Sequence, residues 1–88
     1  MDYLVLREDV IIPLSDVSLP SELSYSAQVV ITTQEPLSWA LLQELSGQPA
    51  RLVRADGTAL GAWIVRRRRD ISENSYMGFV SSTWVSRA

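Results

Sequence analysis

The 88-residue sequence contains no cysteine, no histidine and no lysine, because all eight basic residues are arginines. The missing cysteine and histidine exclude disulfide bonds, thiolate or imidazole metal sites, cysteine nucleophiles and every catalytic pairing of serine with histidine. The missing lysine excludes Schiff-base chemistry and a lysine general base. Carboxylates and arginines are the strong polar groups that remain. The composition therefore predicts a protein with no enzymatic activity, no cofactor and no metal ion.

Long apolar runs are missing as well. The longest, such as residues 62–65, are far shorter than a membrane span or the core of a signal peptide, and the first nine residues (MDYLVLRED) lack a basic segment. We therefore expect a soluble chain without a signal peptide. With 47% hydrophobic and 20% charged residues, the chain is expected to fold as one domain over residues 1–88, close to the lower size limit for standing alone.

Charge is distributed unevenly along the chain. Residues 1–50 carry seven acidic residues and one arginine, a net charge of −6, whereas residues 51–88 carry seven arginines and three acidic residues, a net charge of +4. If the two halves face different directions, the basic side of one copy can meet the acidic side of another in a head-to-tail contact, which produces rings or stacks. The alternative is that the halves interleave and neutralise each other within one subunit.

The sequence begins with two β-type runs. Residues 3–7 and 10–14 are separated by Glu8 and Asp9, which predicts a tight hairpin. Proline cannot donate a backbone hydrogen bond, so Pro13 should restrict the second run to a sheet edge or to the end of its strand.

Two more strands and a helix are predicted before residue 47. Residues 15–25 alternate weakly, which indicates a short strand leading into a loop, and residues 26–33 are rich in Val, Ile and Thr and predict a strand. The apolar period then changes. Residues 36–46 predict one amphipathic helix packed on the sheet, with Pro36 at its first position and Gly47 as a stop signal.

The second half predicts two hairpins. Asp56-Gly57 is the strongest short hairpin signal in the chain. Two long runs, residues 58–72 and 75–86, flank Glu73-Asn74, which would serve as the second turn. That turn would pair Ile71 with Tyr76, Arg68 with Phe79 and Trp63 with Trp84. Together the segments predict a mainly β fold, a small antiparallel β-barrel or sandwich of about six strands with one short α-helix.

Four consecutive arginines, residues 66–69, follow the apolar segment that ends at Val65. Because side chains alternate across a strand, Arg66 and Arg68 share one face and the other two arginines share the opposite face. Both faces are apolar up to Val65 and both are charged from Arg66 onward. This pattern predicts that the strand leaves the core near residue 66 and that the hairpin tip projects as an arm.

The arm is predicted to be a protein interface, since arginine pairs bidentately with carboxylates and is enriched at interfaces together with aromatic residues. The predicted interface residues are Arg66, Arg67, Arg68, Arg69, Tyr76 and Phe79. Two alternatives stay open. The arginines can be solvated charge that prevents unwanted strand pairing, or they can bind nucleic-acid phosphates, although they are split between two faces of an acidic protein.

Other functions remain as alternatives. A hydrolase that uses only carboxylates, with a pair such as Glu8 and Asp9, stays open because sequence does not show proximity, but a turn explains both residues without catalysis. A ligand in the mouth of a barrel could lie between Trp63 and Trp84, where a core tryptophan pair is the default. Trp39 is expected to pack in the core or at its rim.

The order of elements carries a resemblance. A short "LRED" hairpin, a strand ending "DVSL", a Val/Ile strand and a helix are followed by "GQPARLVRADGTALGAWIVRRRRDIS" and "SYMGFVSSTWV". In this order the chain resembles the first β-domain of phage baseplate hub proteins, which are related to the tail-tube fold and to the hub part of type VI secretion spikes. The matching features are Gly47, Gly57, Gly61, Ile64, the basic stretch 66–69, Ser75 and Tyr76.

The resemblance implies a structural ring subunit of a phage tail, tail tip or baseplate, made in the bacterial cytoplasm and carried in the virion. Such a subunit would self-associate or dock on other tail proteins. Family hub proteins have several domains, whereas this sequence covers one. The leading hypothesis is thus a non-enzymatic assembly protein, and the second is a small inhibitory or regulatory module that binds a host protein or nucleic acid.

Overall fold

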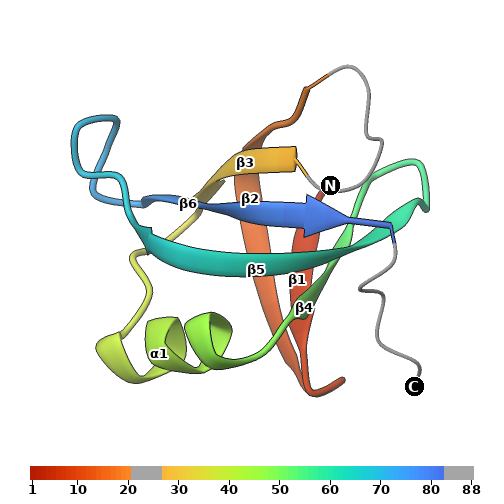
Figure 1. Cartoon of the computed structure of the whole chain (residues 1–88), viewed down its shortest axis with the longest axis horizontal. Coiled ribbons are helices and arrows are strands. Elements are labelled where there is room, and N and C mark those ends of the chain that lie inside the picture. The colour runs from red at the N-terminus through yellow and green to blue at the C-terminus, as the bar shows by residue number, and fades with distance from the viewer. Residues whose placement is uncertain (21–26, 83–88) are drawn as a thin grey trace.

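Six strands and one helix build the part of the chain that the structure, a computed structural model, describes: residues 1–20 and 27–82. The elements are β1 (Tyr3–Leu6), β2 (Val10–Ser18), β3 (Ala27–Thr33), α1 (Trp39–Gly47), β4 (Ala50–Val53), β5 (Ala59–Arg67) and β6 (Ser75–Ser81). All strand pairs are antiparallel and close into one barrel in the order β1-β2-β3-β6-β5-β4 (Figure 1). The predicted mainly β fold with one short helix is confirmed, as a barrel.

Two three-stranded meanders make up the barrel. β1 to β3 form the first and β4 to β6 the second, and they meet at two seams, where β3 pairs with β6 and β1 pairs with β4. The helix α1 connects the two meanders and lies beside β5 (Figure 1). Because the sheet closes on itself, the described strands leave no free edge for the addition of another strand.

The strands and the helix share one hydrophobic core. Leu4, Ile31, Leu52 and Ile64 come from four different strands and are fully buried, and Leu45 of α1 is fully buried with them. Burial of each of these side chains contributes about 1.5–3 kcal/mol to folding. The helix therefore packs against the barrel and contributes to its hydrophobic core.

The predicted first hairpin is confirmed, since Leu6 of β1 pairs with Val10 of β2. The predicted position of Pro13 is wrong, because β2 continues beyond it. β2 pairs with β1 as far as Pro13 and with β3 from Leu14 onward. Pro13 thus lies where β2 changes from one partner strand to the other. A backbone N–H is not needed for pairing at this position, so proline is tolerated there.

Residues 15–18 continue β2 after a bulge between Leu14 and Asp16, so they are not the separate strand that the sequence predicts. Residues 21–25 of that prediction lie outside the described residues. The predicted strand at 26–33 is confirmed by β3.

The predicted helix is confirmed but begins three residues later than expected. Ser38 is its N-cap, and its Oγ accepts a hydrogen bond from the backbone N of Leu41 at 3.2 Å. Pro36 therefore precedes the helix. Leu37, just before the cap, and Leu42, in the second turn, are both buried in the core, an apolar pair that fixes the direction in which the chain enters a helix.

The predicted hairpin at Asp56-Gly57 is confirmed, with Val53 of β4 paired to Ala59 of β5. Gly57 has a φ of 91°, in the left-handed region that only glycine adopts without strain. The Asp56 Oδ1 accepts a hydrogen bond from the backbone N of Thr58 at 2.8 Å. Both turn residues are thus explained by the turn itself.

The predicted register of the last hairpin is wrong. The connection is the loop of residues 68–74, so Arg67 pairs with Tyr76 and Trp63 pairs with Phe79. The predicted partner of Trp63, Trp84, lies outside the described residues. The loop folds back on itself, since the backbone N of Ile71 donates to the carbonyl of Arg68 at 3.0 Å. A two-residue turn at Glu73-Asn74 would not allow this contact.

The sequence predicts a projecting hairpin arm, and this prediction is wrong for most of the arm's length. Residues 76–79 lie in β6, paired with β3 on one side and β5 on the other. Only the loop of residues 68–74 extends beyond the ladder, on the left of Figure 1. Asn74 ties the end of this loop to β3, because its Nδ2 donates to the Thr33 carbonyl at 3.2 Å and its carbonyl accepts from the Thr33 N at 3.0 Å.

Candidate protein-interaction surface

A β-bulge decides where the first arginines of the run point. The register of β5 against β6 shifts between Ile64 and Arg66, so one extra residue displaces the alternation of faces by one position. Ile64 is fully buried and Val65 is exposed. Arg66 is exposed and Arg67 is partly buried. Without the bulge, strict alternation would place Arg66 on the inner face together with Ala62 and Ile64.

Arg67 and Tyr76 belong to the body of the protein. Tyr76 is fully buried, and its hydroxyl accepts a hydrogen bond from the backbone N of Leu37 at 2.7 Å. Arg67 donates from Nη2 to the Leu37 carbonyl at 3.0 Å, and its Cζ lies 5.6 Å from the centroid of the Tyr76 ring, within cation–π range. The sequence predicts both as interface residues, but the structure engages both within the chain.

Arg68 is paired within the loop that follows β5. Its Nε and Nη2 donate to the two carboxylate oxygens of Asp70 at 2.8 and 2.7 Å, a bidentate contact. These hydrogen bonds lower the pKa of Asp70 to about 2 and raise the pKa of Arg68. Arg66 and Arg69, by contrast, have no ion pair within the described part of the chain. The four arginines therefore divide into two with internal partners and two without a carboxylate partner.

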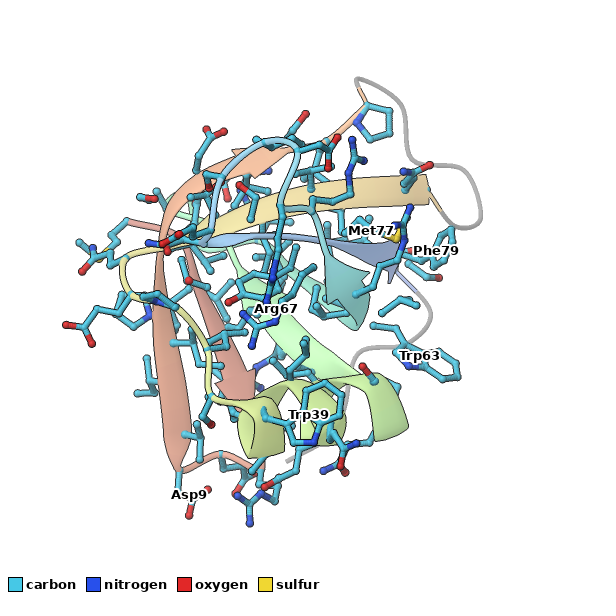
Figure 2. The ribbon with its side chains drawn as sticks, turned by 90° about the vertical axis from the view of Figure 1, so that its left-hand side faces the viewer. Asp9, Trp39, Trp63, Arg67, Met77 and Phe79 are labelled. Carbon is cyan, nitrogen blue, oxygen red and sulfur yellow. The ribbon has the colours of Figure 1, made fainter. Side chains whose placement is uncertain are left out.

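Exposed apolar side chains gather on the outer side of β5, β6 and α1. Trp63 and Phe79 lie opposite each other in the ladder and are 41% and 40% exposed. Val65 is also exposed, and Trp39, at the start of α1, is 68% exposed instead of packing in the core or at its rim as predicted. Figure 2 shows Trp63 and Phe79 on the right of the molecule and Trp39 on α1 below them. We call Trp39, Trp63, Val65 and Phe79 the aromatic face.

Ser46 of α1 orients Trp63, one of the residues of the aromatic face. Its backbone carbonyl accepts a hydrogen bond from the indole Nε1 of Trp63 at 2.5 Å, and its hydroxyl donates to the carbonyl of Ile64 at 2.9 Å. A groove of about 370 Å³ lies between Trp39 and Val65. A tryptophan that is already oriented by its own protein loses less side-chain freedom when a partner binds.

Gly78 sets how closely β5 and β6 approach each other. A Cβ at this position would overlap the carbonyl oxygen of Trp63, so only glycine fits here. Sequence reasoning named Phe79 as an interface residue but missed the rest of the aromatic face, because the predicted register placed Phe79 opposite Arg68 and not opposite Trp63. Two signals could have found it: the alternation of small Ala62 with large Trp63, and the glycine inside an apolar strand.

Three ion pairs are present in the described ranges of the chain. They are Arg7–Glu44, Arg54–Asp2 and Arg68–Asp70. Of these three, only Arg54–Asp2 joins the acidic half of the sequence to the basic half. Ion pairs within the described ranges therefore neutralise little of the charge difference between the two halves. Glu8, Asp9 and Glu35 are exposed, and none of these three has an ion pair among the residues that the structure describes.

Residues 1–20 and 27–82 contain no group of three or more acidic, histidine or cysteine side chains placed to hold a metal ion. Within the same residues, no helix has the length and apolar character needed to cross a membrane. Glu8 and Asp9, the carboxylates considered for hydrolysis, lie exposed in the turn between β1 and β2. Comparisons with protein families, with curated proteins and with solved structures found no match to this chain.

Proposed function

We propose that this chain is a non-enzymatic structural subunit that binds neighbouring proteins through the aromatic face and the adjacent Arg66. The observation that carries the proposal is the exposed pair of Trp63 and Phe79. Tryptophan and arginine supply much of the binding energy at protein interfaces, and contiguous exposed apolar patches mark interaction sites. Arg66 lies two rows along the ladder from this pair, opposite Met77, and adds a guanidinium group that has no ion pair in the described ranges.

The setting that we propose is a phage tail, tail tip or baseplate, with the subunit made in the bacterial cytoplasm and built into the virion as a ring or onto other tail proteins. The resemblance in the glycines and the basic stretch of the second half supports this setting. A closed barrel is suited to it, because a subunit without free edges associates through its side chains and not by open-ended strand pairing.

The number of free arginines favours a protein partner over nucleic acid. Phosphate binding strengthens with each cation that reaches the backbone, and here Arg67 and Arg68 are engaged by the chain itself. The regulatory alternative would show as binding to DNA or RNA that weakens steeply between low and physiological salt.

Substitutions on the aromatic face test the proposal. Trp39→Gln and Phe79→Thr together remove two exposed rings, and we expect the variant to lose self-association, or binding to neighbouring tail proteins, while keeping its fold. Sedimentation velocity and co-purification measure the binding, and circular dichroism with urea denaturation checks the fold. The matched control is Ile71→Thr, which removes a 52% exposed side chain from the loop outside the aromatic face.

The control variant should assemble as the wild type does. Unchanged assembly in the double variant would contradict the proposal, as would an equal loss in the control, because neither result would assign binding to this face.

A further inference from the structure

A second surface lies away from the aromatic face. A groove of about 520 Å³ runs between β2 and the segment that joins β3 to α1. Apolar residues of its lining include Ile11, Pro13, Pro36 and Leu41. Glu35 is the one charged residue that lines the groove in the part of the chain that the structure describes. Ile11 is 62% exposed. We call this surface the apolar groove.

The groove and the Trp63–Phe79 part of the aromatic face lie on different sides of the molecule. In Figure 2 the yellow segment between β3 and α1 lies on the left of the molecule, whereas Trp63 and Phe79 lie on the right. A single copy therefore cannot bring its own aromatic face to its own apolar groove. Two copies can do so, in a contact that uses a different surface from each.

The unpaired charges at the two surfaces have opposite sign. Arg66 borders the aromatic face, and Glu35 lies in the apolar groove; neither has an ion pair in the described ranges. Glu8 and Asp9 add negative charge in the turn that precedes Ile11. The aromatic face contains no carboxylate, so a symmetric contact between two such faces offers Arg66 no partner within the face, whereas a contact between face and groove brings Arg66 to a carboxylate. Charge complementarity thus selects the groove of a second copy.

We propose that the aromatic face of one copy docks into the apolar groove of a second copy, with Arg66 beside Glu35 of that copy. The inference rests on the proposed function and specifies its partner and both of its surfaces. After one such contact the pair still has one free groove, on the copy that used its face, and one free face, on the copy that used its groove. Repetition gives a ring where the rotation between copies closes and a filament where it does not.

A charge exchange tests the contact. Arg66→Glu and Glu35→Arg should each weaken self-association by about tenfold or more, because each places like charges together. The double variant with both substitutions restores opposite charges at every contact and should recover most of the association. The matched control is Asp56→Arg, which makes the same charge change as Glu35→Arg in the β4–β5 turn, outside the two surfaces, and should leave the association constant near that of the wild type.

Cross-linking tests the orientation of the two copies. The chain has no cysteine, so single cysteines can be introduced at Gln28, which pairs with Phe79 in the ladder, and at Gln34, which lines the groove. A mixture of Gln28→Cys and Gln34→Cys chains should form disulfide-linked dimers, and each variant alone should not. Dimers formed by Gln28→Cys alone would show a symmetric contact and overturn the proposal.

The outcomes separate this inference from the proposed function. A wild-type chain that stays monomeric at millimolar concentration, or a double charge variant that is as weak as the single ones, overturns the contact between copies. The proposed function survives either result if the aromatic-face variant still loses binding to neighbouring tail proteins. Both fail if that variant assembles and binds as the wild type does.

Discussion

Tyr76 connects segments of the barrel that are far apart in the sequence. Its hydroxyl accepts a hydrogen bond from the backbone N–H of buried Leu37 at 2.7 Å. Tyr76→Phe would leave that donor without an acceptor, and we predict a loss of about 1–3 kcal/mol in the free energy of unfolding. Urea denaturation measures the loss. Tyr3→Phe is the control, and a change within about 0.5 kcal/mol is expected there; equal stability of both variants would contradict the prediction.

Asp70 offers a test of the arginine pairing by titration. Because hydrogen bonds from Arg68 hold its pKa at about 2, below the ordinary value of 3.8, the pair favours the folded state above pH 4, and this contribution is lost as the pH falls toward 2. Asp70 is exposed to solvent and Arg68 is partly exposed, so the effect on stability is small. We predict that Arg68→Gln raises the Asp70 pKa toward 3.8, as measured by NMR of its carboxyl carbon.

Arg69→Gln is the control for that titration, since Arg69 makes no ion pair in the described ranges. The Asp70 pKa should stay near 2 in this variant. An Asp70 pKa that does not move in Arg68→Gln would show that the bidentate contact is absent in solution.

At the scale of elements, the sequence predicts what depends on neighbours in the chain. The β4–β5 turn follows from Asp56-Gly57, and β3 follows from its β-branched residues, because both signals are local. The β5–β6 register is different, since it depends on the bulge near Val65 and on the contact of Asn74 with Thr33 of β3. Contacts between distant segments leave no periodic signal, and the pairing of Trp63 with Phe79 in the aromatic face was therefore not predicted.

Gly78 allows a test of the close approach of β5 and β6. Gly78→Ala places a methyl group against the carbonyl oxygen of Trp63, and backbone atoms cannot rotate away from it. We predict a loss of about 1–3 kcal/mol in the free energy of unfolding, with faster amide hydrogen exchange in β5 and β6.

Gly47→Ala is the matched control, because its Cβ would meet no atom within 4 Å and its φ is not positive. Alanine favours the helix, so this variant should be as stable as the wild type or more stable, by up to about 1 kcal/mol. If Gly78→Ala proved equally harmless, the strands would have to be further apart in solution than the structure shows.

For the whole molecule, closure of the barrel determines where association can occur. The described strands have both neighbours in the closed sheet, so a partner must bind side chains on the outer faces. The charge asymmetry of the sequence persists in residues 1–20 and 27–82, where Arg54–Asp2 is the one ion pair that joins the acidic half to the basic half. The proposed contact between the aromatic face and the apolar groove would use this asymmetry, because it brings Arg66 of one copy to Glu35 of the next.

Closure also predicts that the two meanders unfold together. Leu52 of β4 is fully buried and pairs with Leu4 of β1 and Leu60 of β5, so one side chain supports both meanders. Leu52→Ala should lower the free energy of unfolding by about 2–5 kcal/mol, and the milder Leu52→Val serves if the alanine variant fails to fold. Amide exchange should quicken in β2 and β3 as much as in β5 and β6. Faster exchange confined to β4, β5 and β6 would show two independent units, and Ile11→Ala, which changes an exposed side chain, should leave both meanders protected.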